Sequence, residues 1–419
     1  MSTSTSPYPF DRVIWIVLDG VGAGELPDAK AYGDTGSNTL GNLAKSLKNN
    51  KTLSLPHLEA MGLGNITTIQ GVPPRAAGKG EGAFGKAVEL SRGKDTTSGH
   101  WEMAGLVVTQ AFETFPNGFP QEVVDRWCRE NKLPGVLGNK SASGTEIIEE
   151  LGAEHLATGK PILYTSADSV WQIAAHEEVF GLQRLYDISK SARKIGDELG
   201  LSRVIARPFI GNPAEGKPFK RTYNRKDYAQ HPHGETILDI LQQNGIPTLG
   251  IGKISSIYAG HGIAENIDTA GNEDGIKVLI EQLDQTKKGL IFCNLIDFDM
   301  LYGHRRDVEG FAVALEDFDA ALPAIKARMT SRDLMIIASD HGNDPTYRGS
   351  DHTREYIPLL TYSPAQTLAG PVDLGIRTSF GDVGATVIHA LLGKADYAGA
   401  KNPLAGKTFL PKIVSSLPA

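Results

Sequence analysis

The chain has 419 residues, of which 40% are hydrophobic, and it carries a formal net charge of -7. A chain of this length buries one large core, or a large core and a smaller one, so we expect one or two domains. The acidic net charge argues against a nucleic-acid-binding protein, because binding the phosphate backbone depends on clustered Lys and Arg. Cys128 and Cys293 have no CxxC partner, which indicates structural thiols in a reducing compartment.

The N-terminal residues and the apolar runs bear on location. Residues 1–9 are rich in Ser and Thr and have no basic region ahead of an apolar run of signal-peptide length. The longest apolar runs are strand-sized, which predicts that the chain does not span a membrane. We therefore expect a cytoplasmic protein that binds neither nucleic acid nor membrane. A monomer fits the sequence, which does not fix the oligomeric state.

Three apolar runs each end on an aspartate: residues 13–18 before Asp19, 290–296 before Asp297 and 334–339 before Asp340. Near-continuous apolar strands are typical of a mostly parallel sheet that is covered on both faces. Amphipathic stretches with helical spacing occupy residues 235–243, 273–283 and 311–325. This alternation predicts an α/β fold, in which ligands bind outside the carboxyl ends of the strands.

The middle of the chain interrupts this pattern with a segment marked by Pro and Gly. It has its own predicted strands, at 161–164 and 204–206, and its own predicted helices, at 122–131 and 189–198. We therefore expect a metal-binding catalytic core from residues 1–108 and 233–419, with residues 109–232 inserted as a cap domain.

The strand that ends on Asp340 is followed directly by His341, and His352 comes after a loop that contains Gly and Ser. Adjacent Asp and His residues at a strand end can present oxygen and nitrogen ligands to a metal ion, and the second His can reach back to it. The alternative is that Asp340 caps a following helix and His341 is a surface residue.

A second candidate cluster contains Asp299 and His304, five residues apart across a bend with Gly303. Both can face one ion if residues 301–303 turn and do not continue as a helix. The alternative, a solvated charged loop, is equally compatible with this segment alone. Asp19 would bring a further carboxylate to the same edge of the sheet.

These candidate ligands combine carboxylates and imidazoles, which suit Mn²⁺, Mg²⁺, Fe²⁺ or Zn²⁺ better than soft thiophilic ions. Six candidates exceed what one catalytic ion usually takes from a protein, so we expect two ions. A pair of ions about 3.5–4 Å apart clamps the attacking and leaving oxygens of an in-line displacement. Phosphoryl transfer is the reaction class that best uses such a clamp.

A nucleophile is expected in residues 93–102, a glycine-flanked segment with three consecutive hydroxyl residues. A Thr oxygen bound to a divalent ion loses its proton easily, which makes Thr96 the candidate. A helix that begins there would also attract phosphate with its backbone N–H groups. The alternative is an N-capping turn in which Asp95 or Thr96 is the cap, and the two roles are compatible.

The ordered set of segments resembles the phosphopentomutases (phosphodeoxyribomutases) of the alkaline phosphatase superfamily. The segments that carry the resemblance are Asp19, residues 94–102, 297–304 and 340–352, together with residues 25–29 and 206–211. The resemblance implies an α/β fold: an alkaline-phosphatase-like core with a mostly parallel sheet between helices, plus an inserted α+β cap domain.

The resemblance also implies a role for each matching residue. Thr96 matches the phosphorylated threonine. Asp19, Asp340 and His341 match one metal site, which Thr96 completes, and Asp299, His304 and His352 match the second. The implied sugar-phosphate contacts are Ser166, Asp168, Arg203 and Arg221, with Arg207 as a competing phosphate contact and Lys253 as a lysine of the core that faces the ligand.

The implied reaction interconverts ribose 1-phosphate and ribose 5-phosphate, or the deoxyribose pair, through a phosphothreonine and a sugar bisphosphate. The implied cofactors are two divalent cations, with Mn²⁺ as the expected ion, and a sugar bisphosphate as activator. A metal-dependent phosphatase on the same scaffold is the alternative, against which the inserted segment argues. A two-metal aminopeptidase or a non-catalytic metal-stabilised module would not need the hydroxyl-rich turn.

Overall fold

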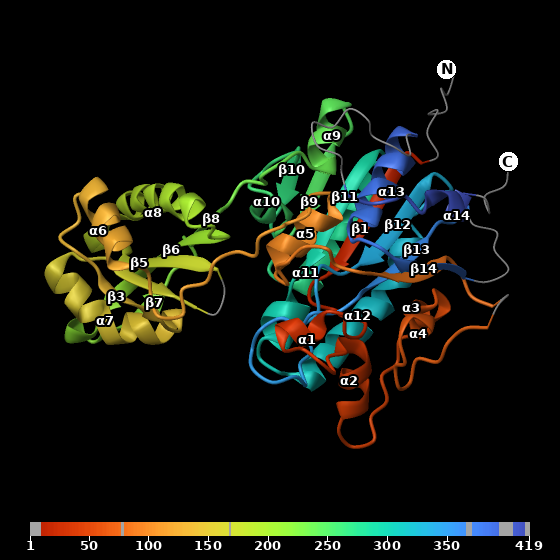
Figure 1. Cartoon of the computed structure of the whole chain (residues 1–419), viewed down its shortest axis with the longest axis horizontal. Coiled ribbons are helices and arrows are strands. Elements are labelled where there is room, and N and C mark those ends of the chain that lie inside the picture. The colour runs from red at the N-terminus through yellow and green to blue at the C-terminus, as the bar shows by residue number, and fades with distance from the viewer. Residues whose placement is uncertain (1–9, 77–78, 167–168, 366–370, 394–404, 415–419) are drawn as a thin grey trace. The chain divides into compact units, whose positions relative to one another are not determined.

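The structure is a computed structural model that describes residues 10–76, 79–166, 169–365, 371–393 and 405–414 (Figure 1). The chain divides into two compact units, unit 1 from residues 1–111 and 232–419 and unit 2 from residues 112–231. The sequence-based borders were drawn after residues 108 and 232. That unit 2 acts as a cap stays a prediction.

Unit 1 is built on an eight-stranded sheet with the order β10-β9-β11-β1-β12-β13-β2-β14. In this order the strands are Glu265–Ile267, Thr248–Ile251, Gly289–Leu295, Arg12–Leu18, Asp333–Ala338, Ile357–Tyr362, Ala83–Ala87 and Val372–Arg377. The first five are mutually parallel, whereas β13 runs antiparallel to both β12 and β2. The predicted mostly parallel sheet of an α/β fold is therefore confirmed.

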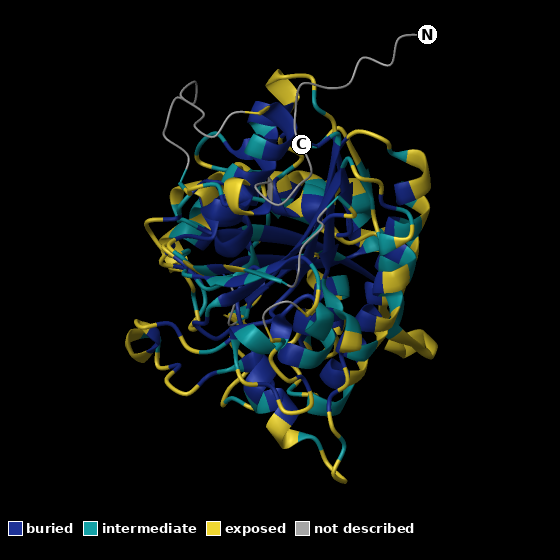
Figure 2. Ribbon diagram, turned by 90° about the vertical axis from the view of Figure 1, so that its right-hand side faces the viewer, coloured by how far each residue is buried: buried dark blue, intermediate teal, exposed yellow. Residues whose placement is uncertain are grey.

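The central strand β1 pairs with β11 and β12 in a register that aligns their carboxyl ends. Leu18 pairs with Leu295, and Val17 pairs with Ala338. All three strands are buried along their whole length, and Figure 2 shows the strands of the sheet in the colour of buried residues. The residues that follow these strands therefore emerge side by side at one edge of the sheet.

Helices cover both faces of the sheet of unit 1. The even-numbered residues Ile14 and Ile16 of β1 pack in one core cluster with residues of α2, α3, α4, α11 and α12. Successive strand residues point to opposite faces, so Trp15 faces the side on which α13 contacts β1. The helices of the first face are Thr39–Ser46, Pro56–Ala60, Leu63–Ile66, Asn272–Gln285 and Val308–Lys326. The helices on or near the second face are α5 (Thr96–Met103), α9 (Ile237–Gln243), α10 (Ile254–Ile257) and α13 (Gly381–Leu392). Two short helices, α1 (Ala29–Tyr32) and α14 (Leu410–Val414), lie elsewhere in unit 1.

Unit 2 has its own sheet, in the order β3-β4-β5-β6-β7, with β8 paired to β6. The strands are Leu137–Ser141, Ile162–Thr165, Val170–His176, Arg203–Asn212, Lys217–Arg221 and Lys226–Ala229. One core cluster joins this sheet to α6 (Gln121–Glu130) and α8 (Leu182–Glu198), and a second joins it to α7 (Gly144–Thr158). A π-helix, Glu177–Gly181, and a 3-10 turn, Pro213–Glu215, complete the unit.

The sequence-based elements agree with these bounds in type, and the observed ones are often longer. The strand predicted at residues 204–206 lies near the start of the ten-residue β6, and the helix predicted at 189–198 is the second half of α8. Among the described residues, no helix combines the length and the apolar character that a membrane crossing requires.

Candidate active site

Asp19 and Asp340 lie side by side because β1 and β12 are paired parallel strands, with Asp19 directly after β1 and Asp340 two residues beyond the end of β12. His341 Nε2 is 3.4 Å from Asp19 Oδ1 and 3.3 Å from Asp340 Oδ2, and all three side chains are fully buried. No helix starts after Asp340, so the alternative of a helix cap is wrong: its Oδ1 accepts hydrogen bonds from the backbone N–H groups of Gly20 and His341.

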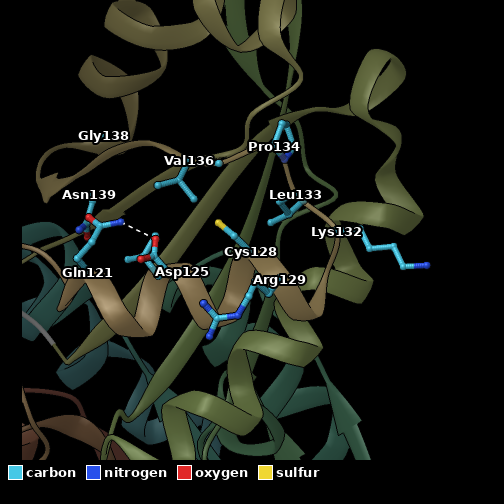
Figure 3. A pocket seen from close by; sticks show the side chains of 12 residues that line it. Gln121, Asp125, Cys128, Arg129, Lys132, Leu133, Pro134, Val136, Gly138 and Asn139 are labelled. Carbon is cyan, nitrogen blue, oxygen red and sulfur yellow. Dashed lines mark hydrogen bonds between the residues drawn. The ribbon is translucent and has the colours of Figure 1, made fainter.

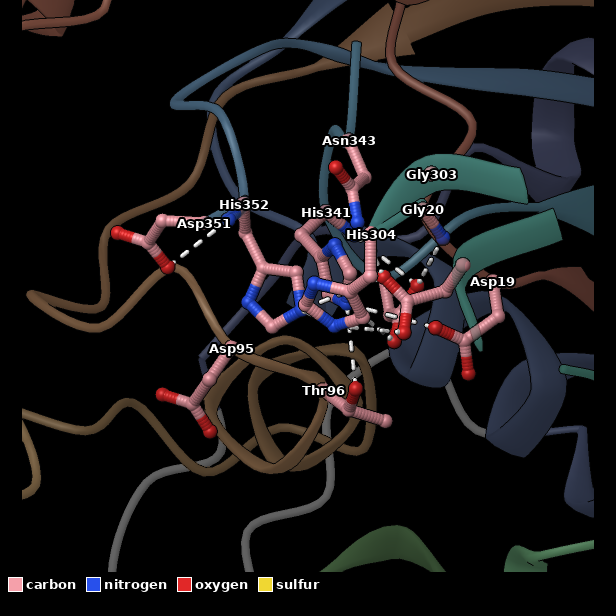
Figure 4. Close-up of polar contacts among 12 residues, drawn as sticks. Asp19, Gly20, Asp95, Thr96, Gly303, His304, His341, Asn343, Asp351 and His352 are labelled. Atoms are coloured by element: carbon pink, nitrogen blue, oxygen red, sulfur yellow. Dashed lines mark hydrogen bonds and ion pairs between the residues drawn. The ribbon is translucent and has the colours of Figure 1, made fainter. Parts of the chain in front are cut away.

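Asp299, His304 and His352 form a second cluster. His304 Nε2 is 3.2 Å from Asp299 Oδ2, His352 Nε2 is 3.3 Å from Asp299 Oδ1, and the two imidazole nitrogens are 3.2 Å apart. The imidazoles of His341 and His352 are also close, with ring centroids 4.0 Å apart and ring planes tilted by 40°. Figure 4 shows the three imidazoles converging, with Asp19 to their right and Thr96 below them. Each cluster offers three ligand atoms that lie within 4.8 Å of one another.

The turn at residues 301–303 that was set as the condition for this cluster is absent, because Phe298–Gly303 forms a π-helix. A π-helix bonds residues five apart, and His304 N donates to Asp299 O at 3.0 Å. This spacing, and not a bend, brings the Asp299 and His304 side chains together. Close packing at the end of the π-helix leaves no room for a side chain at Gly303, since a Cβ added there would lie 2.6 Å from the Asn343 side chain.

Backbone carbonyls orient two of the imidazoles. His304 Nδ1 lies 2.6 Å from Ser350 O and His341 Nδ1 lies 3.2 Å from Gly342 O, so in each ring Nδ1 bears the hydrogen. The Nε2 atoms then face the neighbouring carboxylates, where they could bind a metal ion. This is the arrangement in which a metal-ligating His is usually held by a partner outside the metal's own ligands.

A cation fits both clusters. Asp19 Oδ1 and Asp340 Oδ2 are buried, and within the described residues only imidazole nitrogens lie beside them, at 3.1 to 3.4 Å, whereas their other oxygens accept from Asn294 Nδ2 at 2.7 Å and from Gly20 N at 3.0 Å. Buried carboxylate oxygens without donors are unfavourable unless a positive charge compensates them. A divalent ion between these oxygens and His341 Nε2 would supply that charge.

The pKa values express the same crowding of charge. Burial, and then the neighbouring Asp340, raise the pKa of Asp19 to about 6. Burial alone would lower the pKa of His341, but Asp340, Asp19 and Asp299 outweigh it and raise that pKa well above the usual value. In the second cluster, His352 and His304 overcome the effect of burial and hold the pKa of Asp299 well below its ordinary value. The first cluster therefore retains protons that a metal ion would have to displace.

Thr96 is the first residue of α5 and its side chain points to the first cluster, with Oγ1 3.2 Å from His341 Nε2. The capping alternative is resolved in favour of Asp95, whose Oδ1 accepts from Thr97 N at 3.0 Å and from Ser98 N at 3.1 Å. These two backbone N–H groups, which we expected to attract phosphate, are thus occupied. The Thr96 hydroxyl is not used as a cap and faces the ligands.

Arg354 and Lys94, which the sequence did not single out, fix the segment ahead of Thr96. Arg354 Nη1 donates to the backbone oxygens of Ser91 at 2.7 Å and Gly93 at 2.9 Å, and also to Glu89 Oε2 at 2.7 Å. Lys94 Nζ pairs with Asp34 at 2.9 Å and with Asp351 at 3.0 Å, next to the ligand His352. The sequence held one pointer to Arg354: residues 25–29, a segment that belongs to the resemblance, contain Asp28, which pairs with Arg354 at 3.0 Å.

The predicted sugar-phosphate contacts divide between the units. Lys253 is exposed in unit 1, directly after β9 and Gly252, at the same edge as Asp19. In unit 2, Ser166 is half-buried and Arg221 is exposed, whereas Arg203 has a buried Nε without a hydrogen-bond partner. Asp168 lies outside the described residues.

Arg207 has the most defined surroundings of the predicted arginines. Its Nη2 donates to Gln172 Oε1 at 2.8 Å, and burial raises the pKa of the nearby Tyr164 against the opposing charges of Arg207, Arg225 and Arg221. A Cβ added at Gly144, the first residue of α7, would lie 2.6 Å from Tyr164 Oη and 3.1 Å from Arg207 Nε. Arg207 therefore lies beside the N-terminus of α7, a position that favours anions. Arg225, which the sequence did not indicate, pairs with Asp227 at 2.7 and 2.8 Å.

A separate hollow of about 670 Å³ lies within unit 2, along α6 (Figure 3). Its lining includes Asp125, Cys128, Arg129 and Asn139. It contains none of the residues that the sequence assigned to metal or substrate.

Comparison with known proteins adds a full-length match. A family model described as the Metalloenzyme superfamily matches residues 11–395. Phosphopentomutase of Symbiobacterium thermophilum is 51% identical over 403 residues, covering 96% of this chain and 98% of that protein. Phosphopentomutase of Desulfitobacterium hafniense is 50% identical over 404 residues, covering 96% of this chain and 100% of that protein. Among solved structures, phosphoglycerate mutase of Leishmania mexicana aligns with a TM-score of 0.43 and 12% identity, over 96% of this chain and 98% of that one.

Proposed function

Because the chain belongs to the phosphopentomutase family within the Metalloenzyme superfamily, we propose that it interconverts ribose 1-phosphate and ribose 5-phosphate, and the corresponding deoxyribose phosphates. The observation that carries the proposal is the Thr96 hydroxyl, 3.2 Å from His341 Nε2 and beside two three-ligand clusters. Phosphoryl transfer needs a nucleophile and metal ions that stabilise charge on the transferring group, and a hydroxyl at a two-metal site provides both.

We propose that Asp19, Asp340, His341 and Thr96 hold one divalent cation and that Asp299, His304 and His352 hold the second. Mn²⁺ is the ion that we expect in both sites. When bound, such ions neutralise charge on the transferring phosphoryl group and make the threonine oxygen a better nucleophile and leaving group. Asn294 and Gly20 orient the carboxylates, and Ser350 and Gly342 orient the imidazoles, so the ligands are held before any ion binds.

In the proposed cycle, Thr96 carries a phosphoryl group and gives it to the free hydroxyl of a bound pentose monophosphate. The Thr96 oxygen keeps the electron pair of its broken P–O bond, and the sugar becomes a bisphosphate. The sugar then presents its other phosphate, Thr96 attacks that phosphorus, and the product monophosphate leaves. A sugar bisphosphate from solution would restore the phosphothreonine whenever it is lost to water, which explains the expected activator.

Unit 2 is proposed to bind the parts of the sugar phosphate that do not react. Arg207, at the N-terminus of α7, is suited to the distal phosphate because arginine binds phosphate through charge-assisted hydrogen bonds. Arg203 and Arg221 are weaker candidates for that role, and Ser166 and Asp168 are proposed to bind sugar hydroxyls. As a cap, unit 2 would exclude water, which otherwise hydrolyses a phosphothreonine. We place this activity in the cytoplasm.

The test uses the full chain with Mn²⁺, ribose 5-phosphate and a trace of sugar bisphosphate, and follows ribose 1-phosphate. We expect product with the wild type and with Thr97→Val, the matched control on the same turn, and none with Thr96→Val. Mass spectrometry should find phosphate on Thr96 in the two active proteins. Free phosphate in place of ribose 1-phosphate would instead establish the metal-dependent phosphatase, and a fully active Thr96→Val would refute the nucleophile.

A further inference from the structure

His100 lies one helical turn after Thr96 in α5, and its side chain is fully buried. Its Nδ1 is 2.9 Å from the backbone oxygen of Thr96 and 3.1 Å from Oδ2 of Asp340. One nitrogen of this ring therefore touches both the main chain of the nucleophile and a carboxylate of the first metal cluster. No role in the proposed reaction has so far been given to it.

The surroundings of His100 determine which nitrogen carries its hydrogen. Thr96 O and Asp340 Oδ2 can only accept, so Nδ1 is the donor. Nε2 is buried and has no hydrogen-bond partner in the part of the chain that the structure describes. The ring is enclosed by Phe292 and Tyr258, with centroid distances of 6.1 and 6.4 Å, and the Tyr258 hydroxyl donates to the backbone oxygen of His100. The imidazole thus has one polar function, at Nδ1.

We infer that His100 is a positioning residue whose Nδ1–H holds the first turn of α5 against Asp340, and so sets the nucleophile relative to the first metal site. This inference rests on the proposed function. The two oxygens of Asp340 are then fixed differently: Oδ1 accepts from Gly20 N and His341 N, whereas Oδ2 lies 3.1 Å from His100 Nδ1 and 3.3 Å from His341 Nε2. His341 is itself a proposed metal ligand, so loss of the His100 N–H removes a group outside the ligand set that orients Oδ2.

The consequence concerns one metal site and not the other. His100 contacts Asp340, a ligand of the first cluster, whereas the ligands of the second cluster, Asp299, His304 and His352, contact one another. Removing a group that orients a metal ligand typically weakens metal binding 10- to 100-fold. A substitution at His100 should therefore lower the affinity for one of the two Mn²⁺ ions and misplace Thr96. It should leave the groups that bind the sugar phosphate unchanged.

The experiment compares His100→Asn with His100→Gln, two amide side chains that place their N–H at different distances from the backbone. Asn can place its amide where Nδ1 lies, whereas Gln reaches the position of Nε2. We expect His100→Asn to bind two Mn²⁺ ions within a few-fold of wild-type affinity in calorimetry. His100→Gln, and the ring-shaped His100→Phe, should keep one ion at wild-type affinity and bind the other 10- to 100-fold more weakly.

Two further readouts separate positioning from general damage to the core. In His100→Gln the fraction of Thr96 that carries phosphate after incubation with a sugar bisphosphate should fall, and kcat should fall while KM for ribose 5-phosphate stays constant. Tyr258→Phe is the control, because it removes a neighbouring hydroxyl but leaves Nδ1–H in place, and it should bind both ions normally. Equal weakening of both ions, or wild-type binding of both by His100→Gln, would overturn the inference. Mn²⁺ binding is measured without sugar, so this result does not depend on whether the enzyme proves to be a mutase or a phosphatase.

Discussion

Glu355 offers a test of how the loops around the site are held together. Its side chain is buried, with Oε2 accepting from Thr39 N at 2.8 Å and from Gly24 N at 3.1 Å. Oε1 accepts from the hydroxyls of Thr39 at 2.8 Å and Thr353 at 2.7 Å. Burial, only partly offset by these hydrogen bonds, raises the pKa of this carboxyl to about 7. Glu355→Gln keeps the shape and cannot ionise.

The sign and size of the effect follow from the two states of the chain. The folded carboxyl holds its proton more tightly than the unfolded one, whose pKa is near 4.5, so this contribution to stability is full below that pH and is lost as the pH rises through 7. At 1.36 kcal/mol for each pKa unit, the wild type should lose about 3 kcal/mol from this group between pH 5 and pH 8. Gln avoids the loss, and its amide can donate to the two threonine hydroxyls, which rotate to accept.

The assay is urea unfolding of the metal-free proteins at pH 5, 6, 7 and 8, in the presence of a chelator. The free energy of unfolding of Glu355→Gln minus that of the wild type should increase by about 3 kcal/mol over this range, because other titrating groups cancel in the difference. Glu273→Gln, at an exposed position in α11, is the control and should show no such trend. A difference between Glu355→Gln and wild type that does not vary with pH would refute the reasoning.

Two further predictions concern ligands. Mn²⁺ affinity should fall as the pH is lowered from 8 to 5, because the raised pKa values of Asp19, about 6, and of His341 mean that protons compete with the ion. Calorimetry in buffers of different ionisation enthalpy should show proton release on binding at pH 7, and its absence would contradict this. Arg207→Gln should raise KM for ribose 5-phosphate about 10-fold or more, the value of a charged hydrogen bond to phosphate. Arg129→Gln, at an exposed position of unit 2, should leave KM unchanged. If KM rises equally in the two variants, Arg207 does not bind the phosphate.

Much of the candidate site could be predicted because its ligands follow buried parallel strands. An apolar run that ends on an aspartate places that side chain at a known edge of the sheet, and the register of β1 with β12 does bring Asp19 next to Asp340. The resemblance to phosphopentomutases, which the full-length relatives confirm, supplied the order in which the segments combine. Pattern and resemblance thus reached the same edge of the sheet independently.

The π-helix at Phe298–Gly303 could not be predicted from local spacing. Residues five apart suggest a bend as readily as a π-turn, and the choice depends on the close packing of Gly303 against Asn343, 40 residues later. The supporting contacts of Arg354 and Glu355 were missed for a related reason. Their partners Asp28, Glu89 and Thr39 lie more than 260 residues away in the sequence, so no periodic pattern connects them.

The residues that we propose for phosphoryl transfer and those that we propose for binding the distal phosphate lie in different units of the chain. All residues that we propose to react or to hold metal, from Asp19 and Thr96 to His352, belong to unit 1. Arg207 and the N-terminus of α7 belong to unit 2. Under the proposed mechanism, unit 1 supplies the nucleophile and the metal ligands, which could pass a phosphoryl group to a sugar hydroxyl or to water. The proposal therefore assigns to unit 2 the choice between these acceptors, so that a mutase and a phosphatase can share one set of metal ligands and differ in what the inserted unit binds and excludes.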